Sequence, residues 1–235
     1  MPRLIFVNRF FCPDHSATSQ ILSDLAFDLA DAGREIHVVA SMQLYDDAKA
    51  ALPVSEIING VHVHRVPSTG FGRNALLGRS IDYISFYRSM WQCLVALAQQ
   101  GDIIVAKTDP PLTSIIAMAA ARRNGARLVN WLQDIYPETA VELGVPLMRG
   151  PLAASLTALR NRSLRQADAT VVVGDLMARK AESLGAPSGR VHVIPNWCHD
   201  EVIRPVAQSE NPLRQRWDLA GQFVLGYLAY RAERT

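Results

Sequence analysis

The sequence contains few cysteines, three in 235 residues, and their number is odd. Cys12, Cys93 and Cys198 lie far apart, so they offer neither a disulfide framework nor the ligand spacing of a zinc site. This cysteine usage is typical of a reducing compartment. We therefore expect a cytoplasmic protein without a metal site.

Long hydrophobic runs and an excess of one charge are also missing. No stretch approaches the roughly 20 apolar residues of a membrane-spanning helix, and the first apolar run turns polar at Asn8 and Arg9, too soon for a signal peptide. The formal net charge is only +2, which does not favour nucleic acid as a partner. We expect a protein that is soluble or lies peripherally on a membrane surface.

The loop after the first predicted strand, NRFFCPDHSATS (8–19), contains no glycine. It therefore lacks the G-x-G-x-x-G pattern with which dinucleotide-binding folds approach a pyrophosphate. A nicotinamide site is not expected in this part of the chain.

What the sequence does contain is a regular alternation of short apolar runs and helical patterns, in a chain that is 49% hydrophobic. Continuous apolar strands separated by helices are typical of an α/β fold with a Rossmann-like, doubly wound parallel sheet. The predicted strands are 4–7, 35–40, 60–66, 102–107, 127–132, 168–174 and 190–196, and the predicted helices are 17–32, 80–99, 112–124, 150–166 and 175–184.

The character of the sequence changes after the last of these strands. We assign 1–205 to the Rossmann-like domain and 206–222, which is polar and predicts a short helix at 212–218, to a linker. The apolar run at 223–230 predicts a first strand of another domain, of which 223–235 is the start.

Polar residues follow directly where the fifth predicted strand ends. They are Gln133, Asp134, Tyr136 and Glu138. Ligands of open parallel sheets bind beyond the carboxyl ends of the strands, so these side chains are candidates for a site. The structural alternative is that Asp134 caps a short helix beginning after Pro137.

Two other strand ends offer further candidates. In the first loop, Ser16 or Thr18 could cap the following helix, whose N-terminus favours an anion, and His15 could contact a phosphate or a sugar hydroxyl. Lys107 and Asp109 flank the end of the fourth predicted strand. The structural alternatives are a solvated loop histidine and a surface ion pair.

Two histidines, His62 and His64, lie on one face of the third predicted strand. Their spacing can serve a metal, but no third ligand is recognisable nearby. We interpret them as part of a solvated strand face.

The segment 71–99 predicts a helix that is apolar on more than one side. Such a helix is either buried or has one side against an apolar partner. Arg73, Arg79 and Arg88 are suited to lipid phosphates, and Trp91 lies in an apolar stripe. The segment predicts contact with a membrane surface, with an ordinary core helix as the alternative.

Three stretches together resemble a known family: FCPDHSATSQILSDLAFDLADAGREIHVVAS (11–41), LQDIYPE (132–138) and VIPNWCHDEVIRP (193–205). They are similar to the N-terminal half of family-4 retaining glycosyltransferases of the GT-B type, especially bacterial enzymes that build O-antigen, capsule or exopolysaccharide. The resemblance implies two Rossmann-like domains facing each other across a cleft. This domain would bind mainly the acceptor, and the other mainly a nucleotide sugar, commonly a UDP-sugar, without an obligatory metal or other cofactor.

The resemblance also implies roles for individual residues. Asp134 and Glu138 are the catalytic candidates, although many members carry a histidine where this chain has Gln133. The acceptor-binding candidates are His15, Lys107, Asp109 and Tyr136; the donor-side or interdomain candidates are Ser16 and Asn196; the membrane-contact candidates are Arg73, Arg79, Arg88 and Trp91.

The implied acceptor is a glycan, often linked to a polyprenyl diphosphate and reached from the cytoplasmic face of the inner membrane. Members of the family continue well beyond the position of FVLGY (223–227) with residues that hold the nucleotide. We therefore expect little or no transferase activity from this chain alone. The alternative function is a non-catalytic α/β binding module.

Overall fold

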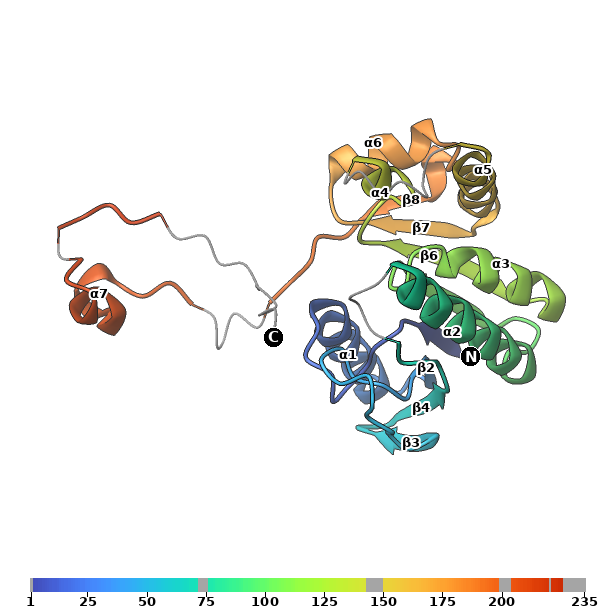
Figure 1. Cartoon of the computed structure of the whole chain (residues 1–235), viewed down its shortest axis with the longest axis horizontal. Helices are drawn as coiled ribbons and strands as arrows, with labels where there is room; N and C mark the ends of the chain where they lie inside the picture. Colours follow the sequence, from blue (N-terminus) through green and yellow to red (C-terminus); the bar gives the residue numbers. More distant parts are fainter. Residues whose placement is uncertain (1, 72–75, 143–149, 199–203, 220, 226–235) are drawn as a thin grey trace. The chain divides into compact units, whose positions relative to one another are not determined.

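The computed structural model describes residues 2–71, 76–142, 150–198, 204–219 and 221–225 (Figure 1). By their contacts they divide into two units, Met1–Asn196 and Trp197–Thr235. The first unit contains one eight-stranded sheet with the strand order β3-β4-β2-β1-β5-β6-β7-β8. All neighbouring strands run parallel except the edge pair β3 and β4.

The elements of the first unit follow the alternation expected from the sequence. The strands are β1 (Leu4–Val7), β2 (Ile36–Ser41), β3 (Ser55–Ile58), β4 (Val61–Val66), β5 (Ile103–Lys107), β6 (Arg127–Leu132), β7 (Ala169–Val172) and β8 (Val191–Val193). The helices are α1 (Ala17–Asp31), α2 (Leu76–Leu97), α3 (Thr113–Asn124), α4 (Glu138–Glu142), α5 (Pro151–Gln166) and α6 (Asp175–Ser183), with a 3-10 turn, η2, at Ser188–Arg190. The Rossmann-like, doubly wound α/β fold is therefore confirmed.

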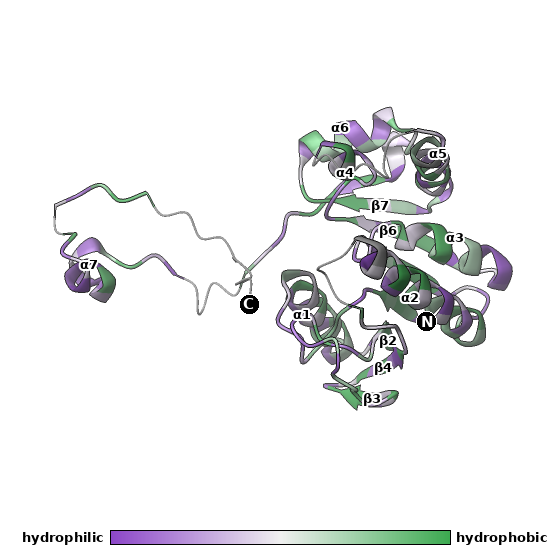
Figure 2. Cartoon of the chain, viewed as in Figure 1, coloured by the Kyte–Doolittle hydropathy of each residue, from purple (hydrophilic) through white to green (hydrophobic). Residues whose placement is uncertain are grey.

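The core lies on both faces of the sheet, because successive side chains of a strand point to opposite faces. On one face, Ile5 and Ile104 pack with α2 and α3, and Phe86 of α2 is fully buried there. On the other face, Phe6 packs with Leu22 of α1. The hydropathy colours of Figure 2 show apolar residues concentrated on the strands and mixed colours on the helices, as expected for helices with one buried side.

One strand was not predicted, and it corrects the expectation of a purely parallel sheet. β3 pairs antiparallel with β4 through a tight turn at Asn59 and Gly60, both of which have positive φ. An Asn-Gly pair between strands is a strong signal for such a hairpin. β3 alternates between exposed and half-buried residues, so it lacks the continuous apolar run by which most of the other strands were predicted.

The helix ends differ little from the predicted ones. α3 ends at Gly125, whose φ of 68° is the left-handed conformation of a C-terminal cap. α2 begins at Leu76, ahead of the predicted residue 80, because Gly78 weakens a helix by only about 1 kcal/mol and does not stop it.

The second unit contains a 3-10 turn, η3 (Gln208–Glu210), and the short helix α7 (Pro212–Arg216) within the predicted 212–218. The Oδ1 atom of Asn211 accepts hydrogen bonds from the backbone N–H groups of Leu213 and Arg214, which caps this helix. Of the strand predicted at 223–230, residues 223–225 have no strand structure, and the remainder lies outside the described residues.

Candidate functional site

The carboxyl ends of β1 and β5 are joined by hydrogen bonds to Thr18, in the first turn of α1. Its hydroxyl donates to Oδ2 of Asp109 over 3.2 Å and accepts from Nδ2 of Asn8 over 3.5 Å, and its carbonyl accepts from Nζ of Lys107 over 3.1 Å. The backbone N–H of Arg9 donates to the carbonyl of Asp109 over 2.7 Å. The first loop and the loop after β5 therefore form one connected surface.

Lys107 is buried, with 1% of its surface exposed. Its ammonium nitrogen lies 4.0 Å from the centre of the Trp131 ring, a cation–π contact. Burial lowers the pKa of Lys107 to about 8, and the charge of Asp109 opposes that shift. In the described structure Lys107 is a buried residue whose ammonium group donates to the Thr18 carbonyl of the first loop and helix. The alternative, a surface ion pair, was therefore wrong.

Asp109 is half-buried beside two guanidinium groups. Burial raises the pKa of its carboxyl, while the charge of Arg9, the hydrogen bond from Thr18 and the charge of Arg79 oppose that rise. Asp109 is thus a carboxylate at the carboxyl ends of the strands, and the charges of Arg9, Arg79 and Asp14 all act on it.

Arg9 and Arg79 meet at one aromatic ring, that of Tyr83. The guanidinium carbon of Arg9 lies 5.2 Å from the ring centre and that of Arg79 lies 5.5 Å from it, while Nε of Arg79 donates to the Tyr83 hydroxyl over 2.8 Å. Burial and the nearby Tyr83 raise the pKa of Tyr136, and the charge of Arg79 opposes this rise. The sequence reasoning missed Arg9 and Tyr83, because nothing in their spacing indicates that they come together.

Gln133 is oriented by contacts on two sides. Its backbone N–H donates to Oγ1 of Thr108 over 3.1 Å, and its side-chain Oε1 accepts from Nδ2 of Asn196 over 2.9 Å. Its Nε2 is buried without a hydrogen-bond partner in the described part of the chain. Asn196, a donor-side candidate, thus lies against the strand end that carries Asp134.

Glu138 forms an ion pair with Arg160 of α5, whose Nη2 lies 2.5 Å from Oε1 of Glu138. The Arg160 side chain is 7% exposed. The pair joins the first residue of α4 to α5, which is a structural role for Glu138. Its catalytic assignment stays a prediction.

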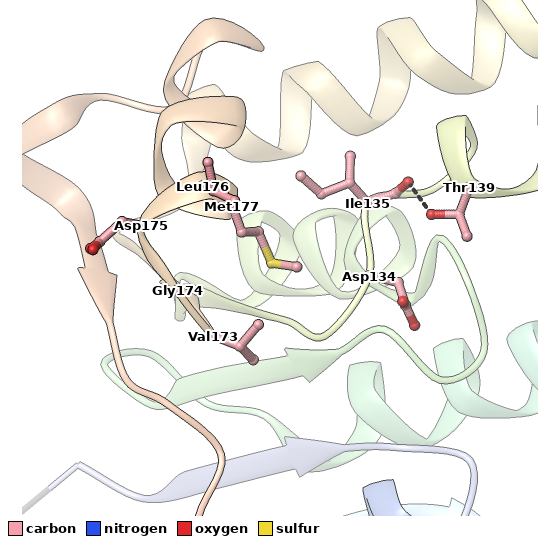
Figure 3. Close-up of a pocket in the computed structure, with 8 residues that line it drawn as sticks. All are labelled: Asp134, Ile135, Thr139, Val173, Gly174, Asp175, Leu176 and Met177. Atoms are coloured by element: carbon pink, nitrogen blue, oxygen red, sulfur yellow. Dashed lines mark hydrogen bonds between the residues drawn. The ribbon is translucent and has the colours of Figure 1, made fainter. Parts of the chain in front are cut away.

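Asp134 is exposed and borders an open cavity of about 620 Å³ at the ends of β6 and β7. In Figure 3 the side chains of Ile135 and Met177 point toward each other across this cavity, and the carboxylate of Asp175 turns away from it. The Asp134 carboxylate makes no hydrogen bond to a described residue, so the helix-cap alternative finds no support within those ranges. The short helix after Pro137, α4, is present as expected.

Ser16 occupies the N-cap position of α1, but its side chain makes no capping hydrogen bond and its Oγ is buried without a described partner. Asp14 accepts instead, from the backbone N–H of Ser16 over 2.8 Å and from that of Tyr45 over 2.5 Å. His15 is exposed, as a solvated loop histidine would be.

The membrane-contact candidates fall in different settings. Arg73 lies outside the described residues. Arg88 is exposed on α2, next to the exposed Ile84, whereas Trp91 is half-buried and packs against the core. In the ranges that the structure describes, no helix combines the length and apolarity needed to cross a membrane.

His62 and His64 meet a third histidine, His37, from the neighbouring strand β2. The His37 ring lies 4.9 Å from that of His62 and 5.3 Å from that of His64, both stacked, and its Nε2 lies 3.1 Å from Oε1 of Glu35. Burial is the largest of the effects that lower the pKa of His37 and of His64. Among the described residues, no group of three or more His, Cys, Asp or Glu side chains is arranged so that it could hold a metal ion. The three histidines are therefore not a metal site.

Residues 17–197 match the family described as "Glycosyl transferase 4-like domain", which is well over half of the chain. The chain belongs to this family. "Probable glycosyltransferase WbjE" from Pseudomonas aeruginosa is 28% identical over 142 residues, which are 60% of this chain and 35% of that protein. The resemblance to the N-terminal half of a GT-B glycosyltransferase, noted from the sequence, is therefore confirmed.

Solved structures of related fold support the same architecture for this glycosyltransferase-family chain. Sucrose-phosphate synthase (tll1590) from Thermosynechococcus elongatus superposes with a TM-score of 0.64 at 13% identity, over 93% of this chain and 53% of that one. Anabaena Alr3699/HepE in complex with UDP and glucose superposes with a TM-score of 0.55 at 18% identity, over 99% of this chain and 54% of that one. At such identities the likeness shows the fold alone. The chain spans about half the length of these structures.

Proposed function

We propose that this chain is the acceptor-side half of a retaining glycosyltransferase that moves a sugar from a nucleotide sugar to a glycan acceptor. The observation that carries the proposal is the convergence of polar side chains and an open cavity at the carboxyl ends of β5, β6 and β7, in a chain of the glycosyl transferase 4-like family. The donor would be a UDP-sugar, because the HepE protein of similar fold has been solved in complex with UDP-glucose. No further cofactor would be required.

In the proposed enzyme, the acceptor-side and donor-side domains would supply different groups for the reaction. Retaining transfer requires a stabilised diphosphate leaving group and an acceptor hydroxyl held close to the anomeric carbon. Asp134, which is exposed at the cavity rim, would contact the reacting sugars, and Tyr136 and Asp109 would contact the acceptor. The groups that hold the leaving diphosphate would come mainly from a second, donor-side domain.

The proposed acceptor is lipid-linked, and the proposed location is the cytoplasmic face of the inner membrane. In support, α2 exposes Ile81 and Ile84 together with Arg88, a combination suited to the boundary between acyl chains and lipid phosphates. The pathway would be synthesis of a surface polysaccharide, such as O-antigen, capsule or exopolysaccharide.

A transfer assay tests the proposal. The chain would be joined to the donor-side half of a related enzyme and incubated with UDP-sugars and polyprenyl-linked glycans, and the configuration of the new bond would be determined by NMR. We expect an α-linked product from an α-linked donor, and a loss of about 10²-fold or more in kcat for Asp134→Asn.

The matched control is Glu182→Gln on α6, which removes an exposed carboxylate outside the cavity lining and should leave kcat unchanged. Equal rates for Asp134→Asn and wild type would contradict the role of Asp134. Inversion of configuration would contradict the retaining mechanism. Robust turnover by the chain on its own would show that the leaving group needs no second domain.

A further inference from the structure

The position of the Asp134 carboxylate depends on the backbone that carries it. This carboxylate is exposed at the rim of the open cavity and makes no hydrogen bond to a described residue. Its place is therefore set by the segment 133–137, which connects β6 to α4 and is called the β6–α4 loop below. The residues that hold this loop decide where the carboxylate lies.

The β6–α4 loop is held at both ends. At its beginning, the backbone N–H of Gln133 donates to Oγ1 of Thr108 over 3.1 Å. At its end, Oε1 of Glu138 lies 2.5 Å from Nη2 of Arg160 on α5. The short span between these two contacts contains Pro137, whose φ is fixed by its ring. The loop backbone therefore has few conformations as long as both contacts are made.

Arg160 is itself fixed, and it borders the loop from the interior of the domain. The residue is 6% exposed, and its Nε donates to Oδ1 of Asn161 over 2.8 Å. A second cavity, of only about 20 Å³, is lined by Arg160 and by Asp134, Ile135 and Tyr136 of the loop. Such a space has room for about one water molecule. The guanidinium group therefore leaves the loop little room to move inward.

The ion pair between Glu138 and Arg160 depends on one contact of the carboxylate. Oε2 of Glu138 is buried without a hydrogen-bond partner in the described part of the chain. If the guanidinium group were removed, the carboxylate would lose its counter-ion while still partly buried, which costs free energy. Glu138 would then turn toward water and move the first residue of α4, together with the end of the loop.

We propose that Arg160 is a positioning residue for the transfer reaction, which keeps Asp134 at the cavity rim by holding Glu138 and supporting the β6–α4 loop. The inference rests on the proposed function, in which Asp134 contacts the reacting sugars. Arg160 is not among the described residues that line the open cavity, so it acts only through the loop. A shift of about 1 Å in a group that contacts the reacting atoms can lower the rate about 10²-fold.

Hydrogen–deuterium exchange of the chain alone tests the hold of Arg160 on the loop without any assay of transfer. We expect the amides of 134–142 to exchange at least about fivefold faster in Arg160→Met than in wild type, because the end of the loop is released. Glu138→Gln removes the same ion pair from its other side and should reproduce the effect. Arg160→Lys keeps the charge but loses the planar fork, so its exchange should lie between the two.

Two variants control for other causes of faster exchange. Arg162→Met removes an exposed arginine from the same helix, and Leu94→Ala lowers stability by opening a cavity beside α2. Leu94 lies near the end of α2 that accepts a hydrogen bond from Arg3, ahead of β1, so it is far from the carboxyl ends of the strands. Exchange in 134–142 should change less than about twofold in both controls.

An equal rise of exchange in Arg160→Met and in Leu94→Ala would overturn the proposal, because the effect would then come from lower stability alone. If Arg160→Met does not fold, as judged by circular dichroism, Glu138→Gln and Arg160→Lys carry the comparison. Exchange as slow as that of wild type in both of them would also overturn it.

The second arm measures transfer with the chain joined to a donor-side half. We expect Arg160→Met to lower kcat at least about tenfold, while KM for the nucleotide sugar changes less than about twofold. In the Asp134→Asn background the same substitution should lower kcat by less than about a further twofold, because Arg160 acts through Asp134. Losses that multiply would show that Arg160 acts independently of Asp134, and would contradict the positioning role.

The two arms separate the positioning role from the proposed function. Faster exchange confined to 134–142, without transfer to any acceptor by wild type, would support the hold of Arg160 on the loop and refute the proposed function. Transfer by wild type with an unchanged kcat in Arg160→Met would refute the positioning role and leave the proposed function intact.

Discussion

Replacing Lys107 by methionine tests how much free energy of unfolding is lost by burying a cation at the carboxyl end of β5. Methionine has a similar length and no charge, so it fills the same space against Trp131. Lys107 is 1% exposed, and its pKa in the folded chain is about 8 against an ordinary value of 10.5. The folded state therefore disfavours the charged form.

The size and sign of the effect follow from that difference in pKa. Below pH 8 both the folded and the unfolded chain hold the proton, so the penalty is fully present. Between pH 8 and pH 10.5 the folded chain loses the proton while the unfolded chain keeps it, so stability rises with pH. At 1.36 kcal/mol for each pKa unit, the rise amounts to about 3 kcal/mol.

The assay is urea unfolding of wild type and Lys107→Met at pH 7 and at pH 10.5. The free energy of unfolding of the variant minus that of wild type should fall by about 3 kcal/mol between these two pH values, because only wild type gains stability from loss of the Lys107 proton. This change with pH is independent of the hydrogen bond to the Thr18 carbonyl that the variant loses, because that loss costs about 1–3 kcal/mol at either pH. Titration of other groups cancels because it is common to both proteins.

Lys49→Met is the control, because Lys49 is exposed and its substitution should give no such pH-dependent difference. If the difference between Lys107→Met and wild type stays constant within about 0.5 kcal/mol, the ammonium group is hydrated in solution. The description of Lys107 as a buried support for the loops would then be wrong.

Three further substitutions test other parts of the structure. Arg160→Met should lower the free energy of unfolding by about 1–3 kcal/mol, because it leaves Glu138 without its ion-pair partner; an unchanged urea midpoint would contradict this. Wild type should lose stability as the pH falls below about 6.5, because burial lowers the pKa of His37 and His64 and the unfolded chain then binds protons that the folded chain does not. His64→Gln should flatten this dependence, and melts at pH 7.5 and 5.5 that shift equally in both proteins would refute the reasoning. Phe86→Ala should cost about 3–5 kcal/mol by opening a cavity under α2, and a loss below about 1 kcal/mol would contradict the assigned burial.

The sheet could be predicted from the sequence because a buried parallel strand reads as a continuous apolar run. The predicted strands 4–7 and 127–132 coincide with β1 and β6, and most other ends differ by one to three residues. β3 was missed because an edge strand needs no such run, although Asn59 and Gly60 carried the signal of its turn. Hydrophobic periodicity therefore detects burial rather than strands as such.

The candidate site was predicted only in part, because periodicity contains no information on which distant loops meet. The strand ends carrying Lys107 and Asp134 followed from the rule for parallel sheets. The burial of Lys107 and the meeting of Arg9 with Tyr83 depend on how α1 and α2 pack against the loops. The histidine stack likewise required the register that places His37 beside His62.

Both outer strands of the sheet are short: β3 has four residues and β8 has three. An edge strand offers its unpaired backbone groups to strands of other molecules, and short edges offer few of them. β3 also places a charged residue, Glu56, in the middle of that edge, paired with Arg65. Fibre-like aggregation through strand addition is therefore disfavoured at both ends, and self-association of this chain should proceed through side-chain surfaces instead.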